Sequence, residues 1–373
     1  MSMRRDRLAA ILVLLPSLIL LGIFVYGFIG RTLYVSTTDW GRGTGGALAL
    51  NPTLHPVGLA NYRELFTGFL DLRFRQDMVN MLWFTLLFVG ASLFLGLLFA
   101  TLLDQHLRGE GLFRTIFLYP MSLSFIVTGT VWRWLLQPQG GVNALPTLFG
   151  LPPGKFLWLS DRTQVLGFNY QALLGYLAAG AAVVLAAGAG FYLWRRRYEA
   201  AAALALPAAV MLLWLATGGA ARARLLPFPE GHGLHLALAG VVLAATWQMS
   251  GYTMALYLAG LRTVPDELRE AARVDGANRW QVYRFVELPL LTPITWSAVI
   301  ILGHIALKIF DLVLAMAGTD NAPTSVPAIT MYLTTFRGNQ FAKGAAIATV
   351  LLVMVSLLII PYLVTSLRPR RAR

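Results

Sequence analysis

Eight apolar blocks of about 20 residues limit what this chain can fold into. A helix needs roughly 20 apolar residues to cross the ~30 Å hydrocarbon core of a bilayer, whereas the core of a soluble protein needs no such runs. The blocks lie at 9–30, 79–103, 116–136, 171–194, 200–220, 234–261, 292–317 and 344–367. In agreement, 57% of the 373 residues are hydrophobic and only 13% are charged. The sequence therefore predicts an all-α membrane protein, a polytopic helical bundle with about eight transmembrane helices.

The basic residues between these blocks predict the orientation of the chain. Segments assigned to the cytoplasmic side hold 17 of the 30 Lys and Arg residues in roughly 60 positions, whereas the outer segments hold 11 in roughly 120, as the positive-inside rule requires. Both termini are basic and are predicted to be cytoplasmic. The net charge of +13 has the same origin, since no basic stripe is interleaved with stacking aromatics as nucleic-acid binding would require. The first block is too long for a signal peptide, and we expect a retained helix.

Four consecutive parts follow from this layout. The first helix and an external loop occupy 1–78, and two core helices occupy 79–136. An external segment at 137–233 contains an inserted transmembrane hairpin at 171–220, with three arginines at its tip. The last part, 234–373, holds the remaining core helices.

A charged stretch at 263–293 interrupts the last part and predicts two short helices around a turn. Gly276 suits a left-handed stop after the first helix. Asn278 and Gln281 have the spacing of a capping box for the second, and Pro289 is expected to end it. From the residues alone, a plug that docks into a partner and an ordinary cytoplasmic loop with interfacial aromatics fit equally well.

The same stretch resembles the EAA signature of ABC importer permeases. The matching positions are Glu270, Ala271, Ala272, Asp275, Gly276, Ala277 and the Leu288-Pro289 pair, with Trp280 on the second helix. Glu287 departs from the pattern, because the family often has a small or hydroxyl residue there. The segments at 57–62, 310–313 and 324–332 resemble those of the carbohydrate-uptake branch of this family, which includes the maltose F-type and the glucose/mannose-type permeases.

This resemblance implies the core of a type I importer permease in the cytoplasmic (inner) membrane. The signature loop would dock as a coupling helix in a cytoplasmic ATPase, and ATP-driven closure would switch the permease between inward- and outward-facing states. The implied partners are a second permease, two ATP-binding subunits and an extracytoplasmic sugar-binding protein. The implied cargo is a sugar, glucose/mannose or an oligosaccharide. The chain itself would hold no catalytic residue, metal or cofactor, with ATP and Mg bound by the ATPases. Accordingly, the nearest string to a Walker A motif, 150–156, has the wrong glycine spacing.

Polar residues inside the apolar blocks are candidates for the substrate pathway, because such groups are costly in lipid. His304, Lys308 and Asp311 are spaced by four and three residues and should share one helical face. Lys308 and Asp311 can then form a buried pair. Mutual neutralisation and direct contact with sugar both remain open for them.

A second set of pathway candidates lies on the preceding block. Trp247, Gln248 and Tyr252 together offer aromatic faces and hydrogen-bonding groups. By resemblance, Tyr252 stands at the position of a substrate-contacting tyrosine in maltose-type permeases. Packing between helices is the alternative for this side chain.

An ion-driven secondary transporter and a membrane enzyme are the alternatives to an importer subunit. An ion-driven secondary transporter should show inverted repeats around an acidic midplane site, yet no paired repeat is evident. A membrane enzyme needs clustered acids or histidines, but the five histidines, His55, His106, His232, His235 and His304, are scattered. Because the chain has no cysteine, disulfides and thiolate sites are excluded.

Overall fold

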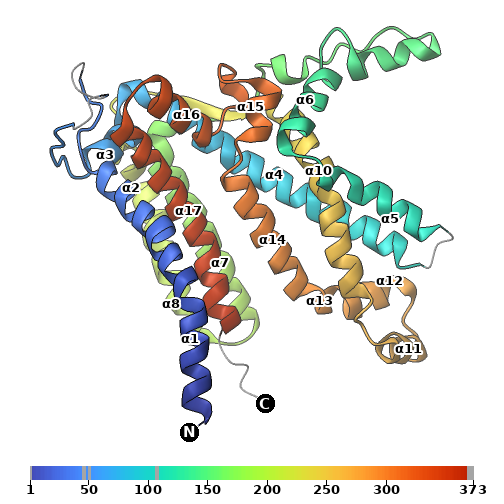
Figure 1. The fold of residues 1–373 in the computed structure, drawn as a ribbon. Coiled ribbons are helices and arrows are strands. Elements are labelled where there is room, and N and C mark those ends of the chain that lie inside the picture. The colour runs from blue at the N-terminus through green and yellow to red at the C-terminus, as the bar shows by residue number, and fades with distance from the viewer. Residues whose placement is uncertain (1, 44–47, 49–51, 106–108, 368–373) are drawn as a thin grey trace.

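The chain forms a helical bundle whose long helices run between two ends of the molecule (Figure 1). The structure is a computed structural model and describes residues 2–43, 48, 52–105 and 109–367. One end carries the start of α1 (Ser2–Leu21), α11 (Asp266–Val274) and the end of α17 (Phe341–Leu367). The opposite end carries α3 (Ala60–Thr67), α15 (Asp311–Ala317) and α16 (Pro327–Tyr332). The basic tail expected at 368–373 lies outside the described residues.

Helices α4 and α10 pack along their length at the centre of the bundle. The central helices are α4 (Leu72–Leu103), α10 (Ala237–Leu261) and α14 (Thr292–Leu307), with α17 against α14. Phe84 and Phe88 of α4 stack on one another and are fully buried, as are Leu238 and Leu302 of the neighbouring helices. The core therefore sits between α4, α10 and α14.

Small residues allow α4 and α10 to approach closely. A Cβ atom at Gly96 would collide with the side chain of Thr253, so only glycine fits there. Thr253 in turn donates a hydrogen bond of 2.7 Å from its hydroxyl to the carbonyl of Ser92. Lipid is as apolar as leucine, so helices in a membrane associate through such packing and interhelical hydrogen bonds. This contact therefore contributes to the α4–α10 pairing.

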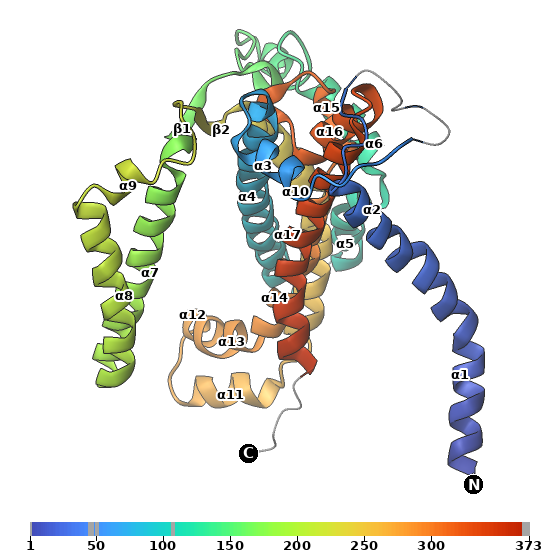
Figure 2. The same cartoon turned by 90° about the vertical axis from the view of Figure 1, so that its left-hand side faces the viewer.

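The first predicted span extends beyond the predicted 9–30. Helix α1, a π-helical turn Gly22–Gly27 and α2 (Phe28–Ser36) form one continuous run. Helix α2 packs against α17, whereas α1 diverges from the bundle (Figure 2). The side chains from 11 to 28 are exposed within the chain, which leaves their apolar surface to lipid or to another subunit.

Two predicted spans are not single helices. The block at 116–136 is divided between α5 (Glu110–Leu118) with a 3-10 turn and α6 (Phe125–Leu135), and these parts are bent by 101°. Leu123 and Ser124 are extended, and the Ser124 hydroxyl caps α6 by accepting the N–H of Val127 at 3.2 Å. The block at 292–317 is likewise divided into α14 and α15. Both predictions of a continuous span were wrong because hydropathy does not register a local break of the backbone.

The long apolar helices of the structure agree with a polytopic membrane protein. Five helices are long and apolar enough to cross a membrane, or up to seven if each bent pair is one span, against the eight predicted. The remaining predicted span is α10, which has 25 residues and is not among these seven. Its polar residues, described below, lower its apolarity.

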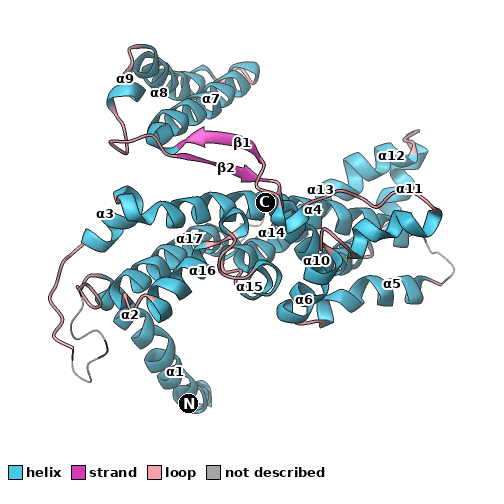
Figure 3. Cartoon of the chain, turned by 90° about the horizontal axis from the view of Figure 1, so that it is seen from above, coloured by secondary structure: helices cyan, strands magenta, loops and turns pink. Residues whose placement is uncertain are grey.

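A two-stranded ribbon that the sequence did not predict connects the inserted hairpin to the core. Strands β1 (Gln164–Asn169) and β2 (Gly231–His235) pair antiparallel and flank the hairpin of α7 (Leu173–Trp194), α8 (Tyr198–Ala216) and the short α9 (Gly219–Arg222). Seen from above, the hairpin stands beside the bundle and joins it through the ribbon (Figure 3). Alanines and glycines, such as Ala182 and Ala208, are the residues that the two helices bury. The hairpin is therefore packed on itself.

Buried charges fasten this ribbon to the start of α4, at the end of the bundle that the sequence predicts to face outward. The words outer and inner refer to this predicted orientation. Arg75 donates two hydrogen bonds to the carboxylate of Glu230, at 2.6 and 2.5 Å, and both side chains are almost fully buried. The ring nitrogens of His232 lie 2.5 Å from Glu230 Oε1 and 2.7 Å from Gln76 Oε1. Tyr170, at the root of the hairpin, places its ring 5.7 Å from the Arg75 guanidinium. We call Arg75, Gln76, Glu230 and His232 the outer clamp.

The outer clamp makes a direct prediction for stability. Replacement of Glu230 by glutamine leaves the Arg75 guanidinium buried without its counter-charge, which costs about 3–5 kcal/mol. We expect Glu230→Gln to lower the free energy of unfolding by this amount, measured by reversible unfolding in mixed micelles. The control Glu64→Gln removes the exposed ion pair with Arg42 and should cost less than about 1 kcal/mol. Equal costs for the two variants would contradict the clamp.

The outer clamp also predicts that the free energy of unfolding depends on pH. Burial acts to raise the pKa of Glu230, but the hydrogen bonds from Arg75 and His232 outweigh it and lower the pKa from its ordinary value of 4.5. Glu230 therefore stabilises the fold above pH 4.5, and this contribution is lost as the pH falls through the lowered pKa. We expect the acid side of the unfolding free energy profile to be shallower in Glu230→Gln. Identical acid profiles would show that Glu230 does not titrate with folding.

Candidate functional site

The stretch 263–293 forms a compact helical loop at the same end of the molecule as the start of α1. Helix α11 leads into a turn, α12 (Arg279–Val282), a π-helical segment Tyr283–Glu287 and α13 (Leu288–Leu290). None of the side chains of α11 is buried. We call 263–293 the coupling loop, after the coupling helix that its resemblance to the EAA signature implies.

The turn of the loop has the geometry predicted from its sequence. Gly276 adopts φ +85°, and its neighbour Ala277 donates a hydrogen bond from its N–H back to the carbonyl of Ala272 at 2.9 Å. No heavy atom lies within 4 Å of a Cβ placed on Gly276, so the backbone conformation rather than space demands glycine. The predicted left-handed stop is confirmed.

The start of the second helix also matches its prediction. Asn278 accepts the N–H of Gln281 at 2.9 Å, and Gln281 accepts the N–H of Asn278 at 2.8 Å. This reciprocal capping box fixes the angle between the turn and α12. Pro289, however, does not end the helix as expected. It sits in the first turn of α13, and the 61° bend into α14 falls at Leu291.

Arg269 is the most connected side chain of α11. Its guanidinium lies 3.2 Å from Asp104 at the inner end of α4, 2.9 Å from Glu287 and 3.7 Å from Asp266. It also donates a hydrogen bond of 3.0 Å to the carbonyl of Leu261, the last residue of α10. These contacts join the coupling loop to both central helices.

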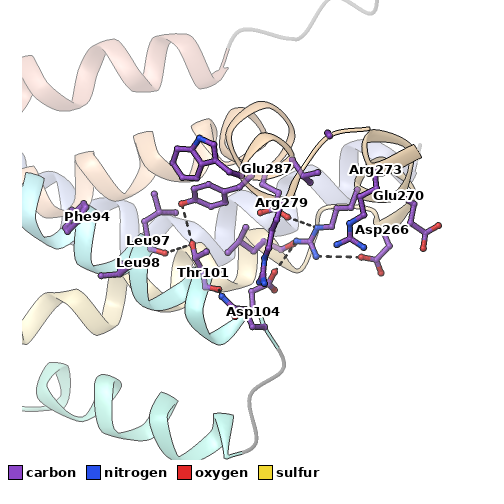
Figure 4. A pocket seen from close by; sticks show the side chains of 17 residues that line it. Phe94, Leu97, Leu98, Thr101, Asp104, Asp266, Glu270, Arg273, Arg279 and Glu287 are labelled. Atoms are coloured by element: carbon purple, nitrogen blue, oxygen red, sulfur yellow. Dashed lines mark hydrogen bonds and ion pairs between the residues drawn. The ribbon is translucent and has the colours of Figure 1, made fainter. Parts of the chain in front are cut away.

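An open cavity of about 1210 Å³ lies between the inner part of α4 and the coupling loop (Figure 4). Phe94 and Leu98 give it an apolar wall from α4, while Glu270, Arg273 and Arg279 line it from the loop. The acidic side chains of Asp104, Asp266 and Glu287 converge on one side of it (Figure 4).

The outer surface of the loop combines charged and uncovered apolar side chains. Glu270 and Asp275 are exposed, and Trp280 and Phe285 expose 67% and 69% of their surface. A small hollow of about 270 Å³ lies beside Gly276, lined partly by Ala272 and Ala277. All seven predicted coupling residues, Glu270, Ala271, Ala272, Asp275, Gly276, Ala277 and Trp280, thus lie on one compact element. This surface has the small residues and apolar side chains that a groove on a partner can accept.

The pathway candidates on α10 face the broken third span. Gln248 is buried and donates a hydrogen bond of 2.7 Å from Nε2 to the carbonyl of Leu123, at the bend before α6. Its Oε1 is buried and accepts no hydrogen bond from the described residues. Trp247 meets Trp132 edge to face at 5.8 Å, and Tyr252 is half-buried against the core. Gln248 and Trp247 therefore lie beside this break, whereas Tyr252, one helical turn further along α10, packs against the core.

The candidates around residue 308 do not form the predicted arrangement. Helix α14 ends at Leu307, and α15 begins at Asp311, so His304, Lys308 and Asp311 do not lie on one helical face. Lys308 and Asp311 are both exposed, and no ion pair joins them in the described part of the chain. The prediction of a buried pair was wrong, because the backbone turns at the position where a continuous helix was assumed. His304 is half-buried on α14.

Sequence reasoning missed Arg269, Asp104 and the outer clamp. Asp104 directly follows an apolar block. An acidic residue at the end of such a block indicates that a basic residue elsewhere in the chain pairs with it. Arg269 directly precedes the signature and, in the sequence, is one of several basic residues of the loop. Their contact spans 165 positions, so no local pattern shows it.

Comparisons with known proteins cover nearly the whole chain. Residues 92–373 match the family described as "Binding-protein-dependent transport system inner membrane component". A probable ABC transporter permease protein of Pyrococcus horikoshii is 36% identical over 358 residues, covering 95% of this chain and 94% of the relative. The xylose/arabinose import permease protein XacH of Haloferax volcanii is 30% identical, covering 92% and 84%. The alpha-glucoside transport system permease protein AglF of Rhizobium meliloti is 26% identical, covering 84% and 70%.

A solved structure has the same fold. The match is a chain of the crystal structure of a bacterial alginate ABC transporter in complex with an alginate pentasaccharide-bound periplasmic protein. The TM-score is 0.64 with 16% identity, and the alignment covers 100% of this chain and 98% of the other. At this identity the likeness concerns the arrangement of helices alone.

The turn geometry generates a local prediction. Alanine at Gly276 must adopt a left-handed conformation that costs an L-residue about 1–2 kcal/mol. We expect Gly276→Ala to raise amide hydrogen exchange throughout the coupling loop, measured by mass spectrometry. Gly180 is the matched control, because it lies in helix α7 with no atom within 4 Å of an added Cβ. Gly180→Ala should leave exchange in the coupling loop unchanged, and a similar increase in both variants would refute the argument.

Proposed function

Because the chain belongs to the family of binding-protein-dependent transport system inner membrane components, we propose that it is the permease subunit through which an ABC importer moves a sugar into the cell. The named relatives that import xylose/arabinose and alpha-glucosides support a sugar as the cargo. The observation that carries the proposal is the exposed coupling loop, in which the signature residues surround a fixed turn at one end of the bundle.

Coupling to a separate motor follows from the form of this loop. Glu270, Asp275 and Trp280 lie on the outer surface of a short helical element that protrudes beyond the bundle. We propose that this element docks in a cleft of a cytoplasmic ATPase subunit, two of which bind ATP and Mg. Their closure would displace the coupling loops of this chain and of a second permease. The chain itself does not hydrolyse ATP.

The proposed orientation places the coupling loop, both termini and the tip of the hairpin in the cytoplasm. Figure 2 supports it, because the start of α1, the turn between α7 and α8 and helix α11 lie at the same end of the molecule. The basic residues of Arg195 to Arg197 at that turn fit the same side of the membrane. A sugar-binding protein would then deliver its cargo at the opposite end, where the ribbon and α16 lie.

The proposed sugar pathway runs beside the break between α5 and α6. Trp247 and Tyr252 supply aromatic faces there, and the free Oε1 of Gln248 supplies an acceptor for a sugar hydroxyl. A buried polar atom without a partner costs about 1–3 kcal/mol, so a passing hydroxyl would relieve it. His304 on α14 is a further candidate, while Lys308 and Asp311 lie at the break beyond it.

Reconstitution tests the proposal. The chain, a second permease, the ATPases and the binding protein are placed in proteoliposomes, and uptake of radiolabelled sugars is measured with and without ATP. We expect ATP-dependent uptake that requires the binding protein. Uptake driven by a proton gradient without the ATPases would overturn the assignment.

Gly276→Asp gives a sharper prediction in the same assay. Aspartate tolerates the left-handed backbone better than most residues, so the effect comes mainly from the charge and bulk that the new carboxylate adds to the docking surface. A loss of about 1.4 kcal/mol in docking corresponds to about tenfold. We therefore expect uptake to fall by at least about tenfold, while the amount of inserted protein stays unchanged. Normal uptake by this variant would argue against a coupling role for the loop.

A further inference from the structure

We propose that Arg269 is a positioning residue that braces the coupling loop against the inner ends of α4 and α10. In this role the side chain transmits displacement of the loop to the two central helices. The inference rests on the proposed function, because it concerns the path by which motion of the docked loop reaches the transmembrane core.

The contacts of Arg269 are distributed over three separate elements. Asp104 belongs to the inner end of α4, Leu261 is the last residue of α10, and Glu287 ends the π-helical segment before α13. Within the described part of the chain, Arg269 is the single residue of α11 that forms an ion pair with another element. The remainder of α11 is exposed or half-buried.

Burial distinguishes this network from ordinary surface ion pairs. The side chains of Arg269, Asp104 and Glu287 expose only 16%, 16% and 14% of their surface. Water screens such charges poorly, and removal of one partner leaves the others uncompensated. Nearby, the pair of Arg262 and Glu110 exposes 44% and 23% and involves a single carboxylate. The network of Arg269 therefore holds α11 in place, whereas the pair of Arg262 and Glu110 is a surface ion pair that contributes little to stability.

The guanidinium is the group that this position requires. Arginine carries five N–H donors in a rigid planar fork and can address several acceptors at once. At this site Nη2 donates hydrogen bonds to the carboxylate of Asp104 at 3.2 Å and to the carbonyl of Leu261 at 3.0 Å, while Nε lies 2.9 Å from the carboxylate of Glu287 as an ion pair. A lysine would keep the charge, but its point-like ammonium lacks the planar fork that meets these acceptors from separate nitrogen atoms. The pairing also accounts for Glu287, the residue that departs from the pattern of the signature.

Besides this brace, the loop is held to the bundle through its two chain ends and through a hydrogen bond of 3.4 Å from the Thr101 hydroxyl of α4 to that of Tyr283. Val264 before α11 and Val282 in α12 are buried, but α11 itself inserts no apolar side chain into the core. Without the brace, α11 would form no ion pair with α4, and its displacement on docking would reach that helix only through the rest of the loop. With the brace, displacement of α11 acts on Asp104 and on Leu261 together.

The first experiment measures sugar uptake per ATP hydrolysed in the reconstituted complex. For Arg269→Ala we expect ATP hydrolysis to continue and uptake per ATP to fall at least about fivefold, the lower range of typical coupling between sites. Arg269→Lys should give an intermediate ratio. The matched control Arg262→Ala should stay within about twofold of the wild type. An unchanged ratio in Arg269→Ala, or an equal loss in the control, overturns the proposal.

The second experiment needs no transported sugar and so separates the brace from the proposed function. The chain contains no cysteine, so spin labels can be attached at introduced cysteines alone. Labels at Leu87 on α4 and at Val274, which is 87% exposed at the end of α11, report their distance distribution by pulsed electron resonance. We expect a narrow distribution that broadens in Arg269→Ala and not in Arg262→Ala. An equally narrow distribution in Arg269→Ala overturns the brace even if uptake per ATP falls in that variant.

Discussion

The close packing of α4 against α10 is the interaction on which the rest of the structure depends. A bilayer offers no hydrophobic gain for bringing two apolar helices together, so their association requires shape and interhelical hydrogen bonds. Because Gly96 has no side chain, Thr253 of α10 can pack directly against α4. The hydroxyl of Thr253 then donates a hydrogen bond to the carbonyl of Ser92. The other helices are arranged around this pair, with α14 on α4 and α17 on α14.

Buried charges fasten the two ends of the α4–α10 pair. At the outer end, Arg75 of α4 binds Glu230, which directly precedes strand β2 and so lies shortly before α10. At the inner end, Arg269 links Asp104 of α4 and Leu261 of α10 to the coupling loop. These contacts tie the α4–α10 pair to the ribbon at one end and to the coupling loop at the other. In the proposed mechanism, a displacement of the loop would therefore act on both helices together.

The parts of the fold that the sequence predicted are those determined locally. The left-handed turn at Gly276 and the capping box of Asn278 and Gln281 depend on residues within a few positions of one another. The breaks before α6 and α15 were missed, since a bend leaves mean apolarity unchanged. The link of Arg75 to Glu230 joins positions 155 apart and depends on the unpredicted ribbon. Long-range polar contacts therefore account for most of what sequence reasoning left out.

Broken helices near a polar side chain also occur in secondary transporters, so they do not discriminate between the two classes. What distinguishes a secondary transporter from an ABC importer is whether an ion gradient or ATP hydrolysis drives transport. An ion-driven mechanism needs an acid at the break that can bind and release the ion, but Asp311 is exposed and stands at the start of α15. The break before α6 presents Gln248, which carries no charge. By contrast, the coupling loop presents a preorganised surface outside the bundle. The polar groups at this break therefore suit a neutral cargo, and the proposed point of entry for the force is the coupling loop.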